Sequence, residues 1–245
     1  MNQEESTVKN VLDRLILALD VVRLEEGREL LASLEGELKY VKIGHQLYAR
    51  GGVPFLREIG KMGFSVFLDI KLHDIPNTIF QAVDPLASEG LWALTLHCGG
   101  GRKMLEEAVR AKEKCGSKTN LLGVTVLTSF DESSWAEVAP GCPLSGALEQ
   151  RAALCRETGI DGIVCSPLDL PVVRRAGSGL FTVVPGVRPA SADDDQARVA
   201  TPQKTIANGA DYIVVGRPIL NAPDRICAVK QIAASIEEGL ACRSR

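Results

Sequence analysis

Residues 65–78 read SVFLDIKLHDIPNT and place two opposite charges at the end of an apolar, strand-like run. Val, Phe, Leu and Ile favour strands, so residues 65–71 predict a strand. Alternation along a strand puts Asp69 and Lys71 on one face, and Ile70 and Leu72 on the other, towards an apolar layer. Charges beside a buried run are costly unless they are paired or functional. The stretch therefore predicts a buried strand whose carboxyl end carries charged side chains.

Apolar runs of the same kind recur along the chain at intervals of about 20–35 residues. Most are continuously apolar, which is typical of parallel strands covered on both faces. The other predicted strands are 15–20, 40–44, 92–98, 121–128, 162–166, 181–186 and 212–216.

Helical patterns alternate with these strands. The predicted helices are 24–34, 53–62, 79–88, 104–114, 144–158, 167–176, 201–208 and 228–238, with Pro54, Pro167 and Pro202 in first turns. Strands that alternate with helices predict right-handed βαβ units. Eight units predict an α/β fold, a TIM (β/α)8 barrel of one domain covering 1–245, with an open doubly wound sheet as the alternative. The longest loops, 129–143 and 188–197, follow strands.

Composition excludes several classes of protein. The net charge of −3 argues against a nucleic-acid binder, which usually has a basic excess. The seven cysteines are odd in number and contain no C-x-x-C pair, which favours free thiols in a reducing, cytoplasmic location. Residues 1–10 have no apolar core of a secretory signal, and no apolar run is long enough to span a membrane.

Polar residues gather where the predicted strands end. They are Asp20, Lys42, Asp69, Lys71, Asp74, Thr128, Arg188 and Arg217, the last of which follows Gly216. Barrel enzymes place their chemistry at this end, so we expect an active site there. A structural ion pair is the plainer alternative. A metal site of Asp69, His73 and Asp74 is a third, which the positive charge of Lys71 disfavours.

The end of the last predicted strand suits a phosphate. Gly216 lets the backbone approach a ligand closely, and Arg217 offers a forked donor for phosphate oxygens. Barrels often hold phosphate in the loops after strands 7 and 8. Arg188 and Gln196, after strand 7, are placed to close over the same group.

The motif from Asp69 to Thr78, DIKLHDIPNT, resembles the signature of the orotidine 5′-monophosphate decarboxylase family, in its bacterial type. The resemblance covers essentially the whole chain. It also includes Leu19-Asp20, Val41-Lys42-Ile-Gly, Thr125-Val-Leu-Thr128-Ser, Pro185-Gly-Val-Arg188-Pro, Asp195-Gln196, Thr201-Pro202 and Val215-Gly216-Arg217-Pro218-Ile. The family implies decarboxylation of orotidine 5′-monophosphate to uridine 5′-monophosphate, the last step of de novo pyrimidine biosynthesis, without metal or cofactor.

The resemblance also implies catalytic roles. Lys71 is expected to donate a proton to pyrimidine C6, with Asp69 and Asp74 flanking it and Lys42 completing a charged chain. Asp74 and Thr78 are expected to reach into a partner's site, which implies a homodimer with shared active sites. Nearby carboxylates favour the ammonium form that this chemistry needs.

Binding roles follow in the same way. Asp20 and Lys42 are expected to hold ribose hydroxyls, Asp69 to face the substrate carboxylate, and Thr128 to lie near the pyrimidine. The expected phosphate ligands are Arg188, Gln196, Gly216 and Arg217.

The alternative within the same superfamily is a Mg-dependent phosphosugar decarboxylase or aldolase. Those enzymes use an added acidic ligand on strand 2. This chain has Lys42 on that strand and no acid, which disfavours the alternative.

Overall fold

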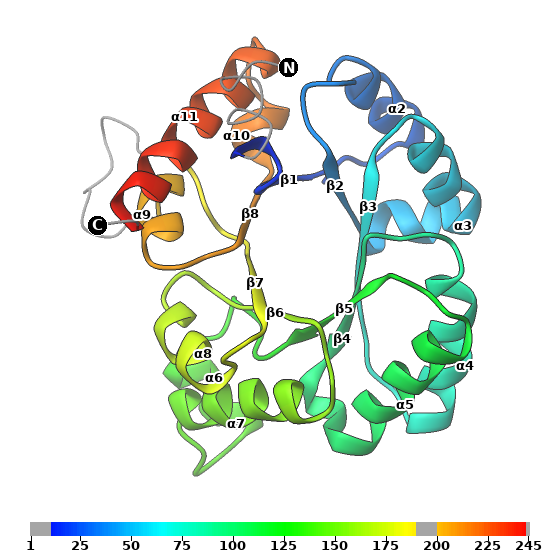
Figure 1. Ribbon diagram of the computed structural model, residues 1–245, viewed down its shortest axis with the longest axis vertical. Coiled ribbons are helices and arrows are strands. Elements are labelled where there is room, and N and C mark those ends of the chain that lie inside the picture. Colours follow the sequence, from blue (N-terminus) through cyan, green and yellow to red (C-terminus); the bar gives the residue numbers. More distant parts are fainter. Residues whose placement is uncertain (1–10, 190–199, 244–245) are drawn as a thin grey trace. The chain divides into compact units, whose positions relative to one another are not determined.

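Eight parallel strands form a closed barrel in the computed structural model, which describes residues 11–189 and 200–243 (Figure 1). The strands are β1 (Leu15–Ala18), β2 (Tyr40–Gly44), β3 (Ser65–Leu72), β4 (Ala93–His97), β5 (Asn120–Val124), β6 (Gly162–Val164), β7 (Phe181–Val184) and β8 (Tyr212–Val215). Each strand pairs with its neighbour in chain order, and β8 pairs with β1. The predicted (β/α)8 barrel is confirmed, and the open sheet is excluded.

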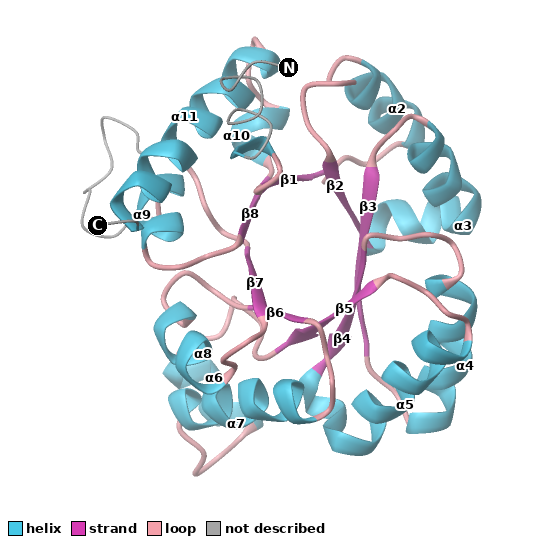
Figure 2. Cartoon of the chain, in the orientation of Figure 1, coloured by secondary structure: helices cyan, strands magenta, loops and turns pink. Residues whose placement is uncertain are grey.

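Helices follow the strands along the chain (Figure 2). They are α2 (Leu24–Ala32), α3 (His45–Lys61), α4 (Pro76–Ala87), α5 (Gly101–Lys114), α6 (Glu132–Val138), α7 (Leu144–Glu157), α8 (Leu170–Ala176), α9 (Pro202–Ala207), α10 (Arg217–Leu220) and α11 (Arg225–Arg243), with a 3-10 turn η1 (Cys98–Gly100). No helix in the described parts of the chain is long and apolar enough to cross a membrane.

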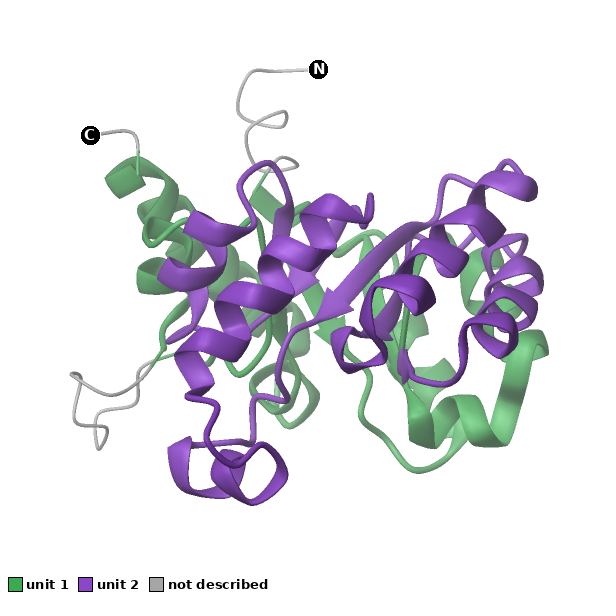
Figure 3. Cartoon of the chain, turned by 90° about the horizontal axis from the view of Figure 1, so that it is seen from below, with its two compact units in different colours: residues 1–69, 184–245 green, residues 70–183 purple. Residues whose placement is uncertain are grey.

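The chain divides into two compact units, shown in different colours in Figure 3. Unit 1 comprises residues 1–69 and 184–245, and unit 2 comprises residues 70–183. The boundary falls inside β3, between Asp69 and Ile70. The prediction of a single domain over 1–245 stays a prediction.

Strand register in unit 1 aligns the residues that were singled out at strand ends. Ala18 of β1 lies opposite Lys42 of β2, and Gly44 at the end of β2 lies opposite Asp69 of β3. A shift of one residue would send every side chain of a strand to the other face. The register therefore fixes the face on which Lys42 and Asp69 project.

The exit of the fifth strand differs from the prediction. The strand ends at Val124 instead of Thr128, and the predicted loop 129–143 contains helix α6. The side chain of Asp131 accepts a hydrogen bond from the N–H of Ser134, and the Ser134 hydroxyl bonds back to the N–H of Asp131. This capping box satisfies N–H groups at the helix start and gives a short helix a defined beginning.

Five helix starts were also misplaced, among them those of α4, which begins at Pro76 instead of residue 79, and α5, which begins at Gly101 instead of residue 104. Helix α3 begins at His45, eight residues before the predicted start, because two helical segments meet at Gly52, whose φ is 53°. Helix α8 begins at Leu170 instead of Pro167, and α11 begins at Arg225 instead of residue 228. In α11 the Asp224 side chain accepts from the N–H of Cys227, an N-cap that extends the helix backwards.

Gly123 of β5 packs against two sulfur atoms of unit 2. A Cβ at this position would lie 2.9 Å from Cys98 Sγ and even closer to Cys155 Sγ of α7. Both cysteines are fully buried and have few ways to move aside. The absence of a side chain at residue 123 therefore lets α7 pack directly on β5.

We expect Gly123→Ala to lower the free energy of unfolding by about 1–3 kcal/mol, the usual range for overpacking a core. Urea unfolding followed by circular dichroism measures the change. Gly60→Ala is the matched control, because a Cβ there meets no atom within 4 Å and alanine favours the surrounding α3 helix. Equal stability of the two variants would show that the sulfurs yield to the extra methyl.

Candidate active site

A chain of alternating charges joins the ends of β1, β2 and β3 in unit 1. Lys42 Nζ lies 3.3 Å from Asp20 Oδ1 and 3.7 Å from Asp69 Oδ2. The side chains of Lys42 and Asp69 are each only 13% exposed, whereas Asp20 is 60% exposed. The inner pair is thus shielded from water, and Asp20 presents an accessible carboxylate beside a lysine.

Two glycines leave room around this charged chain. A Cβ at Gly44 would lie 3.6 Å from Lys42 Nζ. A Cβ at Gly216, directly after β8, would lie 3.3 Å from Ala18 Cβ and 3.7 Å from Asp20 Oδ2. Gly216 therefore brings the backbone that precedes Arg217 close to Asp20.

The predicted phosphate ligands fall in the same unit. Arg217 is exposed and begins α10, immediately after Gly216. Arg188 is exposed after β7, and its N–H donates to the carbonyl of Ala200 at 3.1 Å. Gln196 lies outside the described residues.

Lys71 has an unusual backbone conformation. Its φ is 46°, the one positive φ found at a residue other than glycine in the described part of the chain. Its N–H donates to Thr95 Oγ1 of β4 at 2.8 Å, and Thr95 is fully buried. The left-handed backbone interrupts the strand alternation assumed for Asp69 and Lys71. An anchored, strained residue at a strand end is a common feature of functional sites.

Two histidines stack beside this strand exit in unit 2. The rings of His73 and His97 are 4.9 Å apart and nearly parallel. Nδ1 of His97 accepts the N–H of Gly99 at 3.1 Å, so His97 is a local hydrogen-bonding residue. Burial, followed by the charges of His73, Arg151 and Lys71, lowers the pKa of His97 to about 4. His97 is therefore neutral near pH 7.

The segment between β3 and α4 is open to solvent. Asp74, Ile75 and Thr78 are exposed, and Ile75 retains 67% of its surface. The Asp74 carboxylate accepts a hydrogen bond from the N–H of the next residue, Ile75, at 2.7 Å. An exposed isoleucine between an acid and a threonine gives this surface a mixed apolar and polar character.

Thr128 lies on a loop that is hydrogen-bonded to α7. Thr128 is exposed, three residues beyond Thr125. Arg151 Nη1 of α7 donates to the carbonyl of Thr125 at 2.6 Å, and its guanidinium lies over the ring of Trp135 at 5.0 Å. The loop that bears Thr128 is thus anchored at its base by an arginine.

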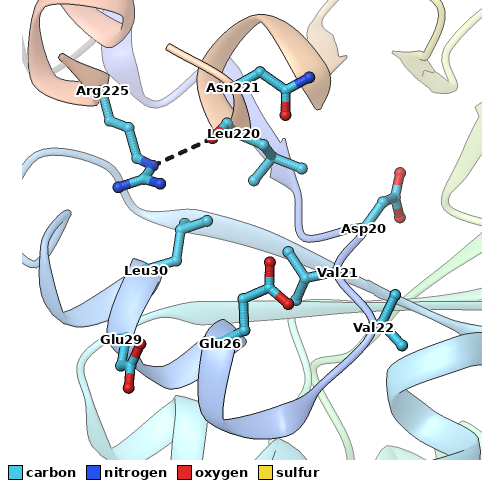
Figure 4. A pocket seen from close by; sticks show the side chains of 9 residues that line it. All are labelled: Asp20, Val21, Val22, Glu26, Glu29, Leu30, Leu220, Asn221 and Arg225. Carbon is cyan, nitrogen blue, oxygen red and sulfur yellow. Dashed lines mark hydrogen bonds between the residues drawn. The ribbon is translucent and has the colours of Figure 1, made fainter. Parts of the chain in front are cut away.

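A pocket of about 310 Å³ lies next to Asp20 in unit 1 (Figure 4). It is lined by Asp20, Val21, Val22, Glu26, Glu29, Leu30, Leu220, Asn221 and Arg225. Three carboxylates against one guanidinium make this lining unsuited to a phosphate dianion. The pocket therefore does not replace the region of Gly216 and Arg217 as the candidate phosphate site.

Residues 11–189 and 200–243 contain no group of three or more His, Cys, Asp or Glu side chains arranged to hold a metal ion. The sequence-based alternative of Asp69, His73 and Asp74 as ligands thus has no such cluster in support. Asp69 lies beside the ammonium of Lys42, and His73 stacks on His97.

Comparison with known proteins gives the family. The family model described as "Orotidine 5'-phosphate decarboxylase / HUMPS family" matches residues 13–232. The chain belongs to this family.

Individual relatives agree with the family match. The orotidine 5'-phosphate decarboxylase of Halorhodospira halophila is 42% identical over 225 residues, covering 91% of this chain and 95% of the relative. That of Nitrosococcus oceani is 40% identical over 226 residues, covering 91% and 97%. The crystal structure of the orotidine 5'-phosphate decarboxylase of Lactobacillus acidophilus is 30% identical, with a TM-score of 0.81 and coverage of 91% and 99%.

Sequence reasoning missed two residues that hold the backbone beside predicted site residues. Thr95 anchors the backbone of Lys71, and Arg151 holds the loop of Thr128. A signal existed for Thr95, the one hydroxyl in β4, which lies between two leucines. Arg151 gave none, because its partners lie 26 and 16 residues away along the chain.

His97 predicts acid sensitivity of the fold. Its folded pKa is about 4, below the ordinary value of 6.5, so the unfolded chain binds this proton more readily. Above pH 6.5 His97 is neutral in both states, so the stability is at its full value. As the pH falls from 6.5 to 4, the unfolded chain takes up the proton first and the free energy of unfolding decreases. We expect His97→Asn, which keeps an acceptor for Gly99, to reduce the loss across this window by about 1–2 kcal/mol.

Urea unfolding at half-unit pH steps measures this effect. His45→Asn is the control, because it removes an exposed imidazole at the start of α3. A slope between pH 6.5 and 4 that is identical in His97→Asn and the unaltered chain would contradict the assignment.

Proposed function

We propose that this chain decarboxylates orotidine 5′-monophosphate to uridine 5′-monophosphate, the last step of de novo pyrimidine biosynthesis. One observation carries the proposal beyond family membership. The Asp20–Lys42–Asp69 chain of charges ends two residues before Lys71, on the same strand. Such an array of paired charges suits a reaction that develops negative charge on carbon and uses no electron sink.

The proposed reaction is a proton-for-CO2 exchange at C6 of the pyrimidine. The bond from C6 to the carboxylate breaks, CO2 leaves, and the electron pair stays in an sp2 orbital at C6. The ammonium of Lys71 stabilises this charge and gives C6 a proton, and the resulting amine regains a proton from solvent. The hydrogen bond from the N–H of Lys71 to Thr95 and the left-handed backbone of Lys71 support this role, because they fix the position of the Lys71 backbone.

The carboxylates have separate proposed roles. Asp69 faces the substrate carboxylate and, through Lys42, is joined to Asp20. Asp20, the exposed member, accepts hydrogen bonds from ribose hydroxyls, and Lys42 donates to them. Asp74, supplied by the other subunit of the proposed homodimer, flanks Lys71 with a negative charge.

The phosphate is proposed to lie at the start of α10. The N–H of Gly216, the guanidinium of Arg217, Arg188 and Gln196 are its proposed ligands, with Thr128 near the pyrimidine. The close approach of Gly216 to Ala18 and Asp20 supports this placement, since it leaves no side chain between the backbone and a ligand. Binding energy from the phosphate is then available to organise the site around the ring.

A Mg-dependent phosphosugar decarboxylase or aldolase is the second candidate and is disfavoured. Its added acid on the second strand is absent, and β2 carries Lys42 between Asp20 and Asp69 instead. A cation at this point repels a divalent ion from the two carboxylates.

Lys71→Ala is expected to lower kcat on orotidine 5′-monophosphate by at least about 10³-fold, because both charge stabilisation and the proton donor are lost. The loss of substrate absorbance measures turnover, and calorimetry with the product nucleotide measures binding, which should persist. Lys61→Ala, exposed at the end of α3, is the control and should keep full activity.

Adding a chelator to the same assay distinguishes the two candidate functions. EDTA should leave turnover unchanged if the proposed reaction is right. Activity that disappears with EDTA and returns with Mg2+, or near-normal turnover by Lys71→Ala, would refute the proposal.

Arg217→Ala is expected to reduce kcat/KM on the nucleotide by about 10²-fold or more, through loss of a charge-assisted phosphate contact. The same variant should hardly change the slow turnover of the phosphate-free nucleoside. Arg175→Ala, an exposed arginine of α8, serves as the control. Equal losses on nucleotide and nucleoside would place Arg217 elsewhere than at the phosphate.

The proposed assembly is a homodimer in which Asp74 and Thr78 complete the site of the other subunit. The exposure of Asp74, Thr78 and the apolar Ile75 supports a protein partner at this surface, because an isoleucine 67% exposed gains by being covered.

Mixing two inactive variants tests this sharing. Co-refolded Lys71→Ala and Asp74→Ala chains should recover about a quarter of normal activity, since half the dimers are mixed and each has one intact site. Size-exclusion chromatography with light scattering checks the dimer. Activity no higher than the mean of the separate variants would mean that each subunit supplies its own Asp74.

The proposed location is the cytoplasm. All seven cysteines are free, as expected of a reducing compartment. Recovery of the chain in a periplasmic or secreted fraction of its source cells would contradict this placement.

A further inference from the structure

Two buried thiols of unit 2 are in direct contact. Cys98 begins η1 after β4, and Cys155 lies on α7, 57 residues further along the chain. Their sulfur atoms are 3.2 Å apart, and the residues are 2% and 0% exposed. Gly123 of β5 lies beneath both sulfurs, with no side chain to separate them.

The other cysteines have different surroundings. Cys165 is as buried as Cys155, yet the structure shows no sulfur in contact with it among the described residues. Cys115 and Cys142 direct their sulfurs to carbonyl oxygens, and Cys227 is exposed beside Gln231. The pair at Gly123 is thus distinguished by contact as well as by burial.

We propose that Cys98 and Cys155 form an internal disulfide when the chain meets an oxidant of the peroxide class. Peroxide oxidises one thiol to a sulfenic acid and is itself reduced to water. The second thiol then attacks this sulfur, the S–S bond forms, and the hydroxyl leaves as a second water. The sulfurs need to approach by roughly 1 Å to reach the S–S bond length of about 2.05 Å.

The surroundings favour coupling over further oxidation. Once one sulfur is oxidised, its nearest nucleophile is the other sulfur at 3.2 Å, whereas further oxidation needs a second peroxide molecule to reach the same buried position. The hydrogen bond with Cys155 and burial raise the pKa of Cys98, while the charge of Arg151, one helical turn before Cys155, acts in the opposite direction. The thiolate is therefore scarce, and the coupling is slow and faster at higher pH.

The disulfide would join the exit of β4 to α7 covalently. On one side lies η1, whose Gly99 bonds to His97. On the other lies the helix whose Arg151 holds Thr125. This cross-link ties together two supports of neighbouring strand ends, and it does not depend on the proposed function.

Peptide mapping tests the proposal on the unaltered full-length chain. The purified protein is treated with hydrogen peroxide at pH 7 and pH 9, free thiols are alkylated in denaturant, and the digest is analysed without reduction. The expected product is one peptide pair that links Cys98 to Cys155, two hydrogens lighter than its parts and cleaved by reductant. Its yield should rise at least several-fold from pH 7 to pH 9.

Two variants serve as a matched pair. Cys155→Ala should abolish the linked pair, whereas Cys165→Ala, an equally buried position, should leave its yield unchanged. The proposal is overturned if Cys98 and Cys155 in the unaltered chain remain fully alkylatable at a peroxide dose that oxidises the exposed Cys227 and Cys242. It is equally overturned if either one pairs with a different cysteine.

Discussion

The placement of one ammonium group between two carboxylates constrains the rest of unit 1. Lys42 is only 13% exposed, and burying its charge would be costly without partners. The cost is offset because Asp20 and Asp69 lie within 3.3 and 3.7 Å. Those distances exist because β1, β2 and β3 pair in one register, with Ala18 opposite Lys42 and Gly44 opposite Asp69. Removing both carboxylates would leave a buried charge uncompensated, and changing the register would separate all three side chains. The fold and the charged chain therefore depend on the same backbone pairing.

Lys71 shows a second constraint, set by backbone strain. A left-handed conformation costs a residue with a Cβ about 1–2 kcal/mol, and Lys71 is held in it by the bond from its N–H to the buried hydroxyl of Thr95. An unstrained strand end would let the lysine follow the regular alternation. His73, two residues further on, stacks on His97. The segment that follows β3 is therefore held first at Lys71 and then at His73. Strain of this kind is consistent with a side chain whose starting point matters to its chemistry.

Much of the barrel could be predicted because its signals are local. Continuous apolar runs such as 212–215 coincide with a strand, and the eight-fold alternation with helices gives the topology. The predicted boundaries were wrong where a local feature other than the apolar pattern determined the structure. The capping box at Asp131 starts a helix in a predicted loop, and Gly52 joins a helical segment that the apolar pattern does not reveal. For the site, residue types at strand ends identified Asp20, Lys42 and Asp69, whereas Arg151 and the strain at Lys71 depend on contacts that no sequence spacing encodes.

The length of β3 explains how an apolar barrel strand can bear this site at all. It has eight residues, whereas the other strands have three to five. Its buried part is Val66, Phe67 and Leu68, and the four residues from Asp69 to Leu72 are only half-buried. A charge within the first part would lie between two apolar layers and lose its hydration. On the overhang, Asp69 still reaches Lys42, and Lys71 still bonds to β4, while neither residue is fully buried. The extra residues thus separate the part of the strand that stabilises the fold from the part available for chemistry.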